Sequence, residues 1–105
     1  MKILVADYDN TIYLDDDKII KTIKKIKKLQ ESGVLFMIST GRSINSILEQ
    51  INKHHLPFDY LSCADGSIIY DKDCHLIKQY ILEFLLLICF LISIKQSILI
   101  VIQLF

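Results

Sequence analysis

The sequence has no excess of charge of either sign, because 12 lysine and arginine residues are matched by 12 aspartate and glutamate residues. Without a positive field the chain has little to hold a polyphosphate backbone, so we do not expect nucleic acid as a partner. It has only three cysteines and no Cys-x-x-Cys pair. This argues against a disulfide framework and a zinc site, and it fits a reducing compartment.

From the sequence we expect neither a signal peptide nor a second domain. Its 105 residues allow one domain, since independent domains usually need about 100 to 200 residues. The start MKILVADYDN reaches Asp7 before an apolar stretch of signal-peptide length can form. An apolar content of 52% excludes disorder. We therefore expect one folded, cytoplasmic domain.

Turn-forming residues are absent from the C-terminal quarter. Residues 81–105 hold 19 apolar residues and no Gly, Pro, Asp or Asn, and only Glu83 and Lys95 are charged. This tail has three interpretations: a core element, a membrane-associated segment, or translation of a shifted reading frame in an A/T-rich gene. A membrane can be a partner only through this tail, although its longest uncharged stretch, Phe84–Ile94, is shorter than a span. We favour the shifted frame, because the composition changes abruptly at Ile81.

Short apolar runs alternate with amphipathic stretches in residues 1–80. The runs at Lys2–Ala6, Val34–Ile38 and Asp59–Cys63 are typical of buried strands in a parallel sheet. Between them, apolar residues recur with the helical period of 3.6 residues, which predicts two helices. The apolar positions of these helices are Ile19, Ile20, Ile23, Ile26 and Leu29, then Ile44, Ile47, Leu48 and Ile51. Strands that alternate with helices indicate right-handed βαβ units and an α/β fold.

Local signals mark the ends of these elements. Asp15–Asp17 precede the first helix, where the helix dipole favours negative charge, and Gly33 ends it. Ser67–Tyr70 and His75–Tyr80 predict a hairpin, whose turn places Cys74 where Gly or Asn is preferred.

Polar motifs follow each of the three predicted strands. They are Asp7-Tyr8-Asp9-Asn10-Thr11, Ser39-Thr40-Gly41-Arg42 and Ala64-Asp65-Gly66-Ser67. In a parallel α/β sheet, ligands bind outside the carboxyl ends of the strands. Each motif also has an ordinary structural explanation: a solvated acidic turn, a strand-to-helix turn with Ser43 as N-cap, and a tight Asp-Gly turn. Their coincidence at one edge of the sheet favours a ligand site.

The first two motifs suit a metal and a phosphate. Asp7 and Asp9 leave the strand on the same side, and two carboxylates so close are costly unless a cation such as Mg²⁺ shares them. Thr40 can donate a hydroxyl hydrogen bond to a phosphoryl oxygen, and Gly41 lets the backbone approach an anion at a helix N-terminus.

The motifs DYDNT, STGR and ADGSIIY, in this order after successive strands, resemble those of the haloacid dehalogenase (HAD) superfamily. The second and third resemble the Cof-type branch, phosphatases of sugar phosphates and nucleotide cofactors with a large inserted cap. The resemblance covers about residues 1–80. It implies part of a Rossmann-like, three-layer α/β core with parallel strands, followed by a hairpin and the apolar tail, and a small phosphorylated substrate.

The resemblance implies a role for each residue of the first two motifs. Asp7 would be the nucleophile that forms an aspartyl-phosphate, and Asp9 would protonate the leaving alcohol and then activate water. The Asp7 carboxylate and the Asp9 main-chain carbonyl would bind Mg²⁺. Thr40, Gly41 and Arg42 would bind the phosphoryl group.

Three further residues are implied to line the pocket: Thr11, Asp65 and Gly66. Thr11 would tie the catalytic loop by a local hydrogen bond rather than touch the substrate. Asp65 departs from the Asn-Gly pair that is usual in the branch, and it adds negative charge near an anionic substrate.

Two parts of the family's site are missing from the sequence. They are a lysine that neutralises the phosphoryl group and a later Gly-Asp motif with further acidic residues. Without them most of the stabilisation of transition-state charge is lost, so we expect this polypeptide to be inactive or nearly so. The alternatives are a non-catalytic phosphate- or metal-binding remnant, a membrane-tethered peptide, and a phospho-accepting receiver domain. The receiver is disfavoured because its phosphorylated aspartate normally comes from a later strand.

The missing second half also affects the predicted sheet. It leaves the first strand at an edge, and an apolar edge strand is a template for pairing with other chains. We therefore expect the full chain to aggregate or enter membranes, and a chain ending at Tyr80 to be more soluble.

Overall fold

The computed structural model describes residues 2–63, 68–76 and 99–103. In chain order the elements are β1 (Lys2–Asp7), α1 (Lys18–Glu31), β2 (Leu35–Ser39), α2 (Ile44–His54), β3 (Tyr60–Cys63), β4 (Ile68–Asp71) and β5 (Leu99–Gln103). The three predicted strands and two predicted helices of residues 1–63 are all present, with bounds that differ by a few residues.

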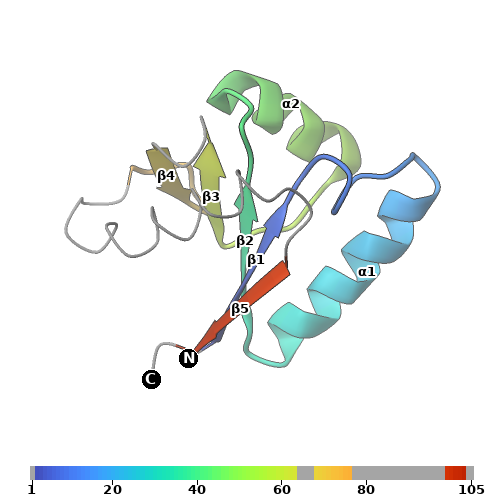
Figure 1. The fold of residues 1–105 in the computed structure, drawn as a ribbon, viewed down its shortest axis with the longest axis vertical. Helices are drawn as coiled ribbons and strands as arrows, with labels where there is room; N and C mark the ends of the chain where they lie inside the picture. The colour runs from blue at the N-terminus through green and yellow to red at the C-terminus, as the bar shows by residue number, and fades with distance from the viewer. Residues whose placement is uncertain (1, 64–67, 77–98, 104–105) are drawn as a thin grey trace.

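The strands form one sheet in the order β4-β3-β2-β1-β5 (Figure 1). β1 pairs with β2 and β2 with β3 in parallel, whereas β4 and β5 flank them as antiparallel strands. The two βαβ units advance in the same direction along the sheet, which is why both helices cover the same face. The predicted α/β class is confirmed.

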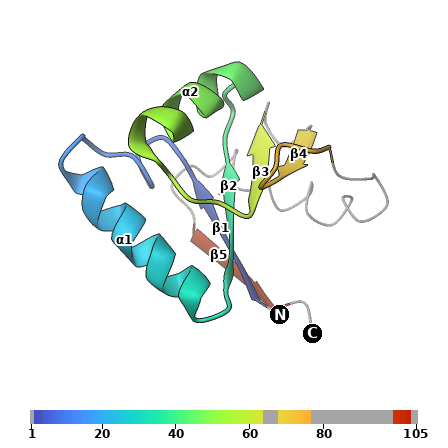
Figure 2. The ribbon, with the colours of Figure 1, turned by 180° about the vertical axis from the view of Figure 1, so that it is seen from behind.

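The hydrophobic core lies between the sheet and the two helices (Figure 2). Ile26 of α1 and Ile47 and Ile51 of α2 pack in one cluster with strand residues such as Phe36 and Ile38. The periodic spacing of these isoleucines gives each helix one apolar stripe, as the sequence predicts.

The other face of the sheet is buried too. Side chains alternate along a strand, so Ile3, Val5 and Met37 point away from the helices. They are exposed by only 2%, 0% and 0% respectively. Strands that are apolar at successive positions, rather than at alternate ones, are typical of sheets buried on both faces.

The predicted helix ends are found where the sequence places them. The Asp15 carboxylate accepts hydrogen bonds from the main-chain N–H groups of Asp17 (3.0 Å) and Lys18 (2.7 Å) at the start of α1. Gly33 follows α1 with a φ of +91°, a conformation that favours glycine. The hydroxyl of Ser43 accepts from the N–H of Ser46 at 3.3 Å and so caps α2.

The predicted hairpin is only partly within the described residues. β4 pairs antiparallel with β3, and after it a turn brings the N–H of Asp71 to the carbonyl of His75 at 2.9 Å. Cys74 has a φ of +59° in this turn, the left-handed conformation that made a cysteine unexpected there. Tyr70 bridges Leu76, and residues 77–80 of the predicted second strand lie outside the described part.

The expectation that β1 lies at the edge of the sheet is wrong. β5, from the apolar tail, pairs antiparallel with β1 along its length, from Lys2 with Gln103 to Ala6 with Leu99. The prediction considered only strands found by their motifs. An open strand edge offers unpaired N–H and C=O groups to any extended apolar segment, and residues 99–103 are such a segment.

The rest of the tail, residues 81–98 and 104–105, lies outside the described residues. Within the described residues, no helix is long and apolar enough to cross a membrane.

Candidate active site

The motifs of the first two strands meet at the carboxyl edge of the parallel strands. The register aligns Asp7 of β1 with Ser39 of β2, and Ser39 with Ser62 of β3. The N–H of Thr40 donates to the carbonyl of Ser62 at 2.9 Å, which ties the loop after β2 to β3. Asp7 is half-buried at this edge, so the structure brings the expected nucleophile close to the expected phosphate loop.

A tight loop after β1 sets the position of Asp9. The carbonyl of Tyr8 accepts from the N–H groups of Ile12 (3.1 Å) and Tyr13 (2.9 Å). The N–H of Asn10 donates to the carbonyl of Tyr13 at 2.9 Å. Asn10 has a φ of +64°, which asparagine tolerates better than most residues. Because Tyr8 and Ile12 are buried, the loop is anchored in the core on both sides of Asp9.

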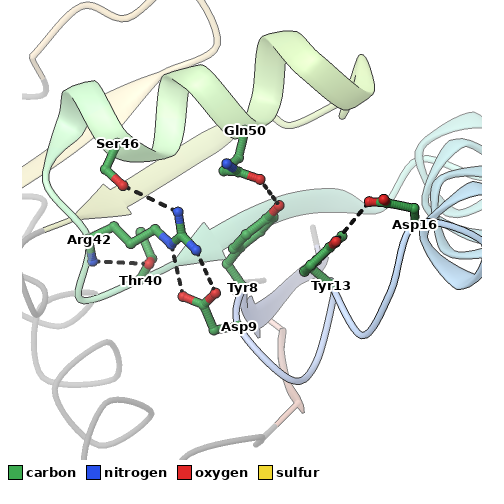
Figure 3. Close-up of polar contacts among 8 residues, drawn as sticks. All are labelled: Tyr8, Asp9, Tyr13, Asp16, Thr40, Arg42, Ser46 and Gln50. Carbon is green, nitrogen blue, oxygen red and sulfur yellow. Dashed lines mark hydrogen bonds and ion pairs between the residues drawn. The ribbon is translucent and has the colours of Figure 1, made fainter.

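Asp9 is held by Arg42 (Figure 3). The Nε–H of Arg42 donates to Oδ2 of Asp9 at 3.0 Å, and Nη2–H donates to Oδ1 at 2.9 Å. The Arg42 side chain is 31% exposed and the Asp9 side chain is 47% exposed, so solvent and a ligand can reach the pair. The hydrogen bonds that Arg42 donates to Asp9 raise the pKa of Arg42, against a smaller opposing effect of desolvation.

Tyr8 forms a platform beneath this pair. The guanidinium carbon of Arg42 lies 5.3 Å from the centre of the Tyr8 ring, a cation–π distance. The hydroxyl of Tyr8 donates to Oε1 of Gln50 on α2 at 3.2 Å, and burial raises the pKa of this phenol. Arg42 also donates from Nη1 to the hydroxyl of Ser46 on α2 at 3.3 Å. Two side chains of α2 thus fix the groups around Asp9.

Thr40 and Gly41 shape the loop between β2 and α2. The hydroxyl oxygen of Thr40 accepts from the N–H of Arg42 at 3.1 Å, and the side chain is 1% exposed. Its hydroxyl hydrogen can still be donated, because an acceptor role leaves the O–H free. Gly41 is exposed next to it. The loop therefore offers one hydroxyl donor and an uncrowded backbone.

Thr11 does not make the expected local hydrogen bond. Its Oγ1 is buried and has no hydrogen-bond partner among the residues that the structure describes. The residue lines an apolar cavity of about 190 Å³ between α1 and the sheet, together with Leu4, Ala6, Ile12, Thr22, Lys25, Ile26, Leu29 and Phe36. Asp65 and Gly66, also expected in the pocket, lie outside the described residues.

The donor set at the end of β1 fits a hard divalent cation. Arg42 occupies both carboxylate oxygens of Asp9, so a cation here would be held by the carboxylate of Asp7 and the main-chain carbonyl of Asp9. Within the described chain, no main-chain N–H donates to that carbonyl. Oxygen ligands in small number suit Mg²⁺, which keeps several waters and shares substrate phosphates.

The chain is similar to a known protein family. A family model described as haloacid dehalogenase-like hydrolase matches residues 4–101. The chain belongs to this family. The match extends past Ile81, where the composition of the chain changes, and it includes most of β5.

A curated relative of this HAD-like hydrolase is 5-amino-6-(5-phospho-D-ribitylamino)uracil phosphatase YcsE of Bacillus subtilis (strain 168). The two are 31% identical over 85 residues, which cover 79% of this chain and 33% of the relative. The chain thus spans about a third of the length of the curated relative it matches. No solved structure matches it.

Three residues of the HAD-like site were missed by sequence reasoning. Tyr8, Ser46 and Gln50 surround Arg42 and Asp9, yet none belongs to a motif position with an assigned role. A signal for the last two was present, because positions 46 and 50 are four residues apart within the second predicted helix and so share one side of it. Tyr8 gave no signal, since an aromatic residue between two aspartates is equally compatible with packing.

Proposed function

We propose that this HAD-like chain carries the nucleophile and phosphate loop of a magnesium-dependent phosphatase. The substrate would be a small phosphorylated metabolite, of the sugar-phosphate or nucleotide type. The observation that carries the proposal is the juxtaposition of Asp7, Asp9 and Thr40 at the carboxyl edge of β1 and β2. The relative's activity on a phosphorylated ribityl compound supports this substrate class, and the sequence argument for a cytoplasmic location is compatible with it.

Asp7 would act as the nucleophile. Its carboxylate oxygen attacks phosphorus and forms the aspartyl-phosphate while the bond from phosphorus to the leaving alcohol oxygen breaks. Mg²⁺, when bound, would neutralise charge on the phosphoryl oxygens. Water then attacks the aspartyl-phosphate, which releases inorganic phosphate and restores Asp7.

Asp9 would move the protons in both steps. It gives a proton to the leaving alcohol and takes one from the attacking water. In the structure both carboxylate oxygens of Asp9 accept hydrogen bonds from Arg42. Thr40 would orient the phosphoryl group by donating its hydroxyl hydrogen.

The proposal is tested by binding and turnover together. We expect calorimetry to detect binding of inorganic phosphate that requires Mg²⁺ and is weakened about tenfold or more in a Thr40→Val variant, since this variant loses a hydrogen bond to a charged group. We expect hydrolysis of p-nitrophenyl phosphate to remain at background, because the sequence lacks the family's lysine and later acidic motif.

Each outcome has a clear meaning. Magnesium-dependent turnover that disappears in an Asp7→Asn variant would show that the chain is a working phosphatase and that the missing groups matter less than expected. Magnesium-dependent phosphate binding without turnover is the expected result, because the nucleophile and phosphate loop are present without the family's lysine and later acidic motif. Absence of magnesium-dependent phosphate binding would contradict the proposed site.

A further inference from the structure

Arg42 directs its donors at the protein rather than at an open phosphate site. Among the residues that the structure describes, three of the five guanidinium N–H groups have partners: two on Asp9 at 3.0 and 2.9 Å and one on Ser46 at 3.3 Å. One face of the guanidinium lies over the ring of Tyr8. The sequence resemblance assigns Arg42 to phosphate, but these contacts indicate a different role.

The arrangement needs an arginine. A planar fork can reach both oxygens of a carboxylate and lie flat on an aromatic ring at the same time, whereas a lysine ammonium presents a point charge. Bidentate pairs fix the orientation of the carboxylate as well as its distance. Arg42 therefore restricts the side-chain torsions of Asp9, which would vary more freely in an exposed aspartate without such a partner.

The parts that hold Arg42 belong to different elements. Tyr8 comes from the loop that carries Asp9, and Ser46 comes from the first turn of α2 (Figure 3). The hydroxyl of Tyr8 returns to α2 through Gln50. The loop after β1 is thus joined to α2 at two points, and the position of α2 determines where the carboxylate of Asp9 lies.

We propose that Arg42, supported by Tyr8 and Ser46, is a positioning residue that holds the Asp9 carboxylate and is not a ligand of the phosphoryl group. This assignment rests on the proposed function of Asp9. It predicts that the affinity for phosphate resides in the loop of Thr40 and Gly41 and that the loss of Arg42 affects the orientation of Asp9.

The pair can be observed directly, because Arg42 is the only arginine in the sequence. In the full chain labelled with ¹⁵N-arginine, a single Nε–H signal reports on it. We expect slow exchange of this proton with water in the native chain. We expect exchange about tenfold faster or more in Asp9→Asn, since a hydrogen bond between charged groups is lost.

The matched control is Asp16→Asn, which removes the same charge from the same loop region. Asp16 accepts from the hydroxyl of Tyr13 at 2.7 Å and not from Arg42. In Asp16→Asn we expect the Nε–H of Arg42 to exchange at the same rate as in the native chain. Asp9→Glu keeps the charge and shifts the carboxylate by one methylene, so we expect an Nε–H exchange rate between those of the native chain and Asp9→Asn. It replaces Asp9→Asn in the measurement if Asp9→Asn does not fold.

A second measurement separates positioning from phosphate binding. Calorimetry with inorganic phosphate and Mg²⁺ is expected to give affinities for Arg42→Lys and Arg42→Gln within about threefold of the native chain, whereas direct loss of a charged hydrogen bond costs about tenfold. A tenfold loss in both variants would overturn the assignment and return Arg42 to the phosphate site.

The exchange measurement does not depend on phosphatase function. Equal exchange in the native chain and Asp9→Asn, or equal acceleration in Asp9→Asn and Asp16→Asn, would show that Arg42 does not hold Asp9. If the native chain binds no phosphate, the proposed function fails, while the exchange rates still decide whether Arg42 holds Asp9.

Discussion

Thr11 carries a hydroxyl that the fold buries without a hydrogen-bond partner among the described residues. Such a group loses its hydrogen bonds to water on folding and forms none within the described part of the protein, which costs about 1 to 3 kcal/mol. Valine has nearly the same shape and no hydroxyl. We therefore expect Thr11→Val to raise the free energy of unfolding in urea by about 1 kcal/mol.

The matched control for this variant is Thr22→Val. Thr22 lines the same cavity, but its hydroxyl donates to the carbonyl of Lys18 at 3.2 Å. Thr22→Val therefore removes a hydroxyl that already has a partner, and it should not raise the free energy of unfolding. A clear loss of stability in Thr11→Val would mean that the Thr11 hydroxyl is bonded after all and ties the loop as the family resemblance implies.

The cysteines allow a second test at the residue scale. Burial raises the pKa of the Cys63 thiol to about 11, whereas Cys74 is exposed in the turn after β4. The thiolate is the reactive form, and a pKa two units above the ordinary value leaves about a hundredfold less of it at pH 8. We expect mass spectrometry to find rapid alkylation of Cys74 and slow alkylation of Cys63.

Labelling of Cys63 then reports on unfolding. In urea above the unfolding midpoint, both thiols should react at similar rates, because Cys63 loses its burial. Equal labelling of the two cysteines in the native chain would contradict the burial of the end of β3.

The motif residues could be predicted from the sequence, but their partners could not. Asp7, Asp9 and Thr40 follow apolar runs, and the carboxyl ends of parallel strands converge on one edge, so their proximity is a consequence of topology. The pairing of Arg42 with Asp9 depends instead on side-chain torsions and on where α2 places Ser46. No spacing along the chain encodes that contact, because it joins two loops.

At the scale of elements, α2 connects the fold to the site. Its N-cap, Ser43, satisfies the N–H of Ser46, and Ser46 in turn accepts from Arg42. Replacing an N-cap serine by alanine typically costs about 1 kcal/mol. We expect Ser43→Ala to lower the free energy of unfolding by this amount, measured by urea denaturation with circular dichroism.

Asn45→Ala provides the comparison for this prediction. Asn45 is exposed within α2, and alanine is the better helix former, so this variant should be unchanged or slightly more stable. Equal destabilisation by both substitutions would show that the Ser43 cap contributes nothing specific.

Element prediction succeeded where one local pattern sufficed. Helical periodicity and the signals at Gly33 and Ser43 placed α1 and α2, and apolar runs placed β1 to β3. The strand β5 was missed because a tail without turn residues has no local signal that tells a strand from a helix or a membrane segment. Its pairing with β1 is a long-range contact, which only the whole sheet determines.

At the scale of the whole molecule, β5 changes the expected behaviour of the chain in solution. With β5 in place, β1 has hydrogen-bonded neighbours on both sides. A chain ending at Tyr80 would lose β5 and expose β1 as an apolar edge strand. We therefore expect the shortened chain to elute as larger species in size-exclusion chromatography than the full chain at equal concentration, which reverses the expectation from the sequence.

A monodisperse shortened chain that melts cooperatively would contradict this prediction and show that β5 is dispensable. A proline at Ile100 in the full chain is a milder version of the same test. It removes one main-chain donor from the strand that pairs with β1, and it should shift elution in the same direction.

The pairing of Lys2 with Gln103 also bears on how the chain is made. During translation β1 emerges before β5, and the chain grows at about 5 to 20 residues per second. After β2 is complete, the free side of β1 therefore waits several seconds for its second neighbour. During this interval the nascent chain carries an apolar strand, β1, whose main-chain groups are unpaired on one side. Neighbouring nascent chains on the same messenger RNA then compete with β5 for pairing with β1.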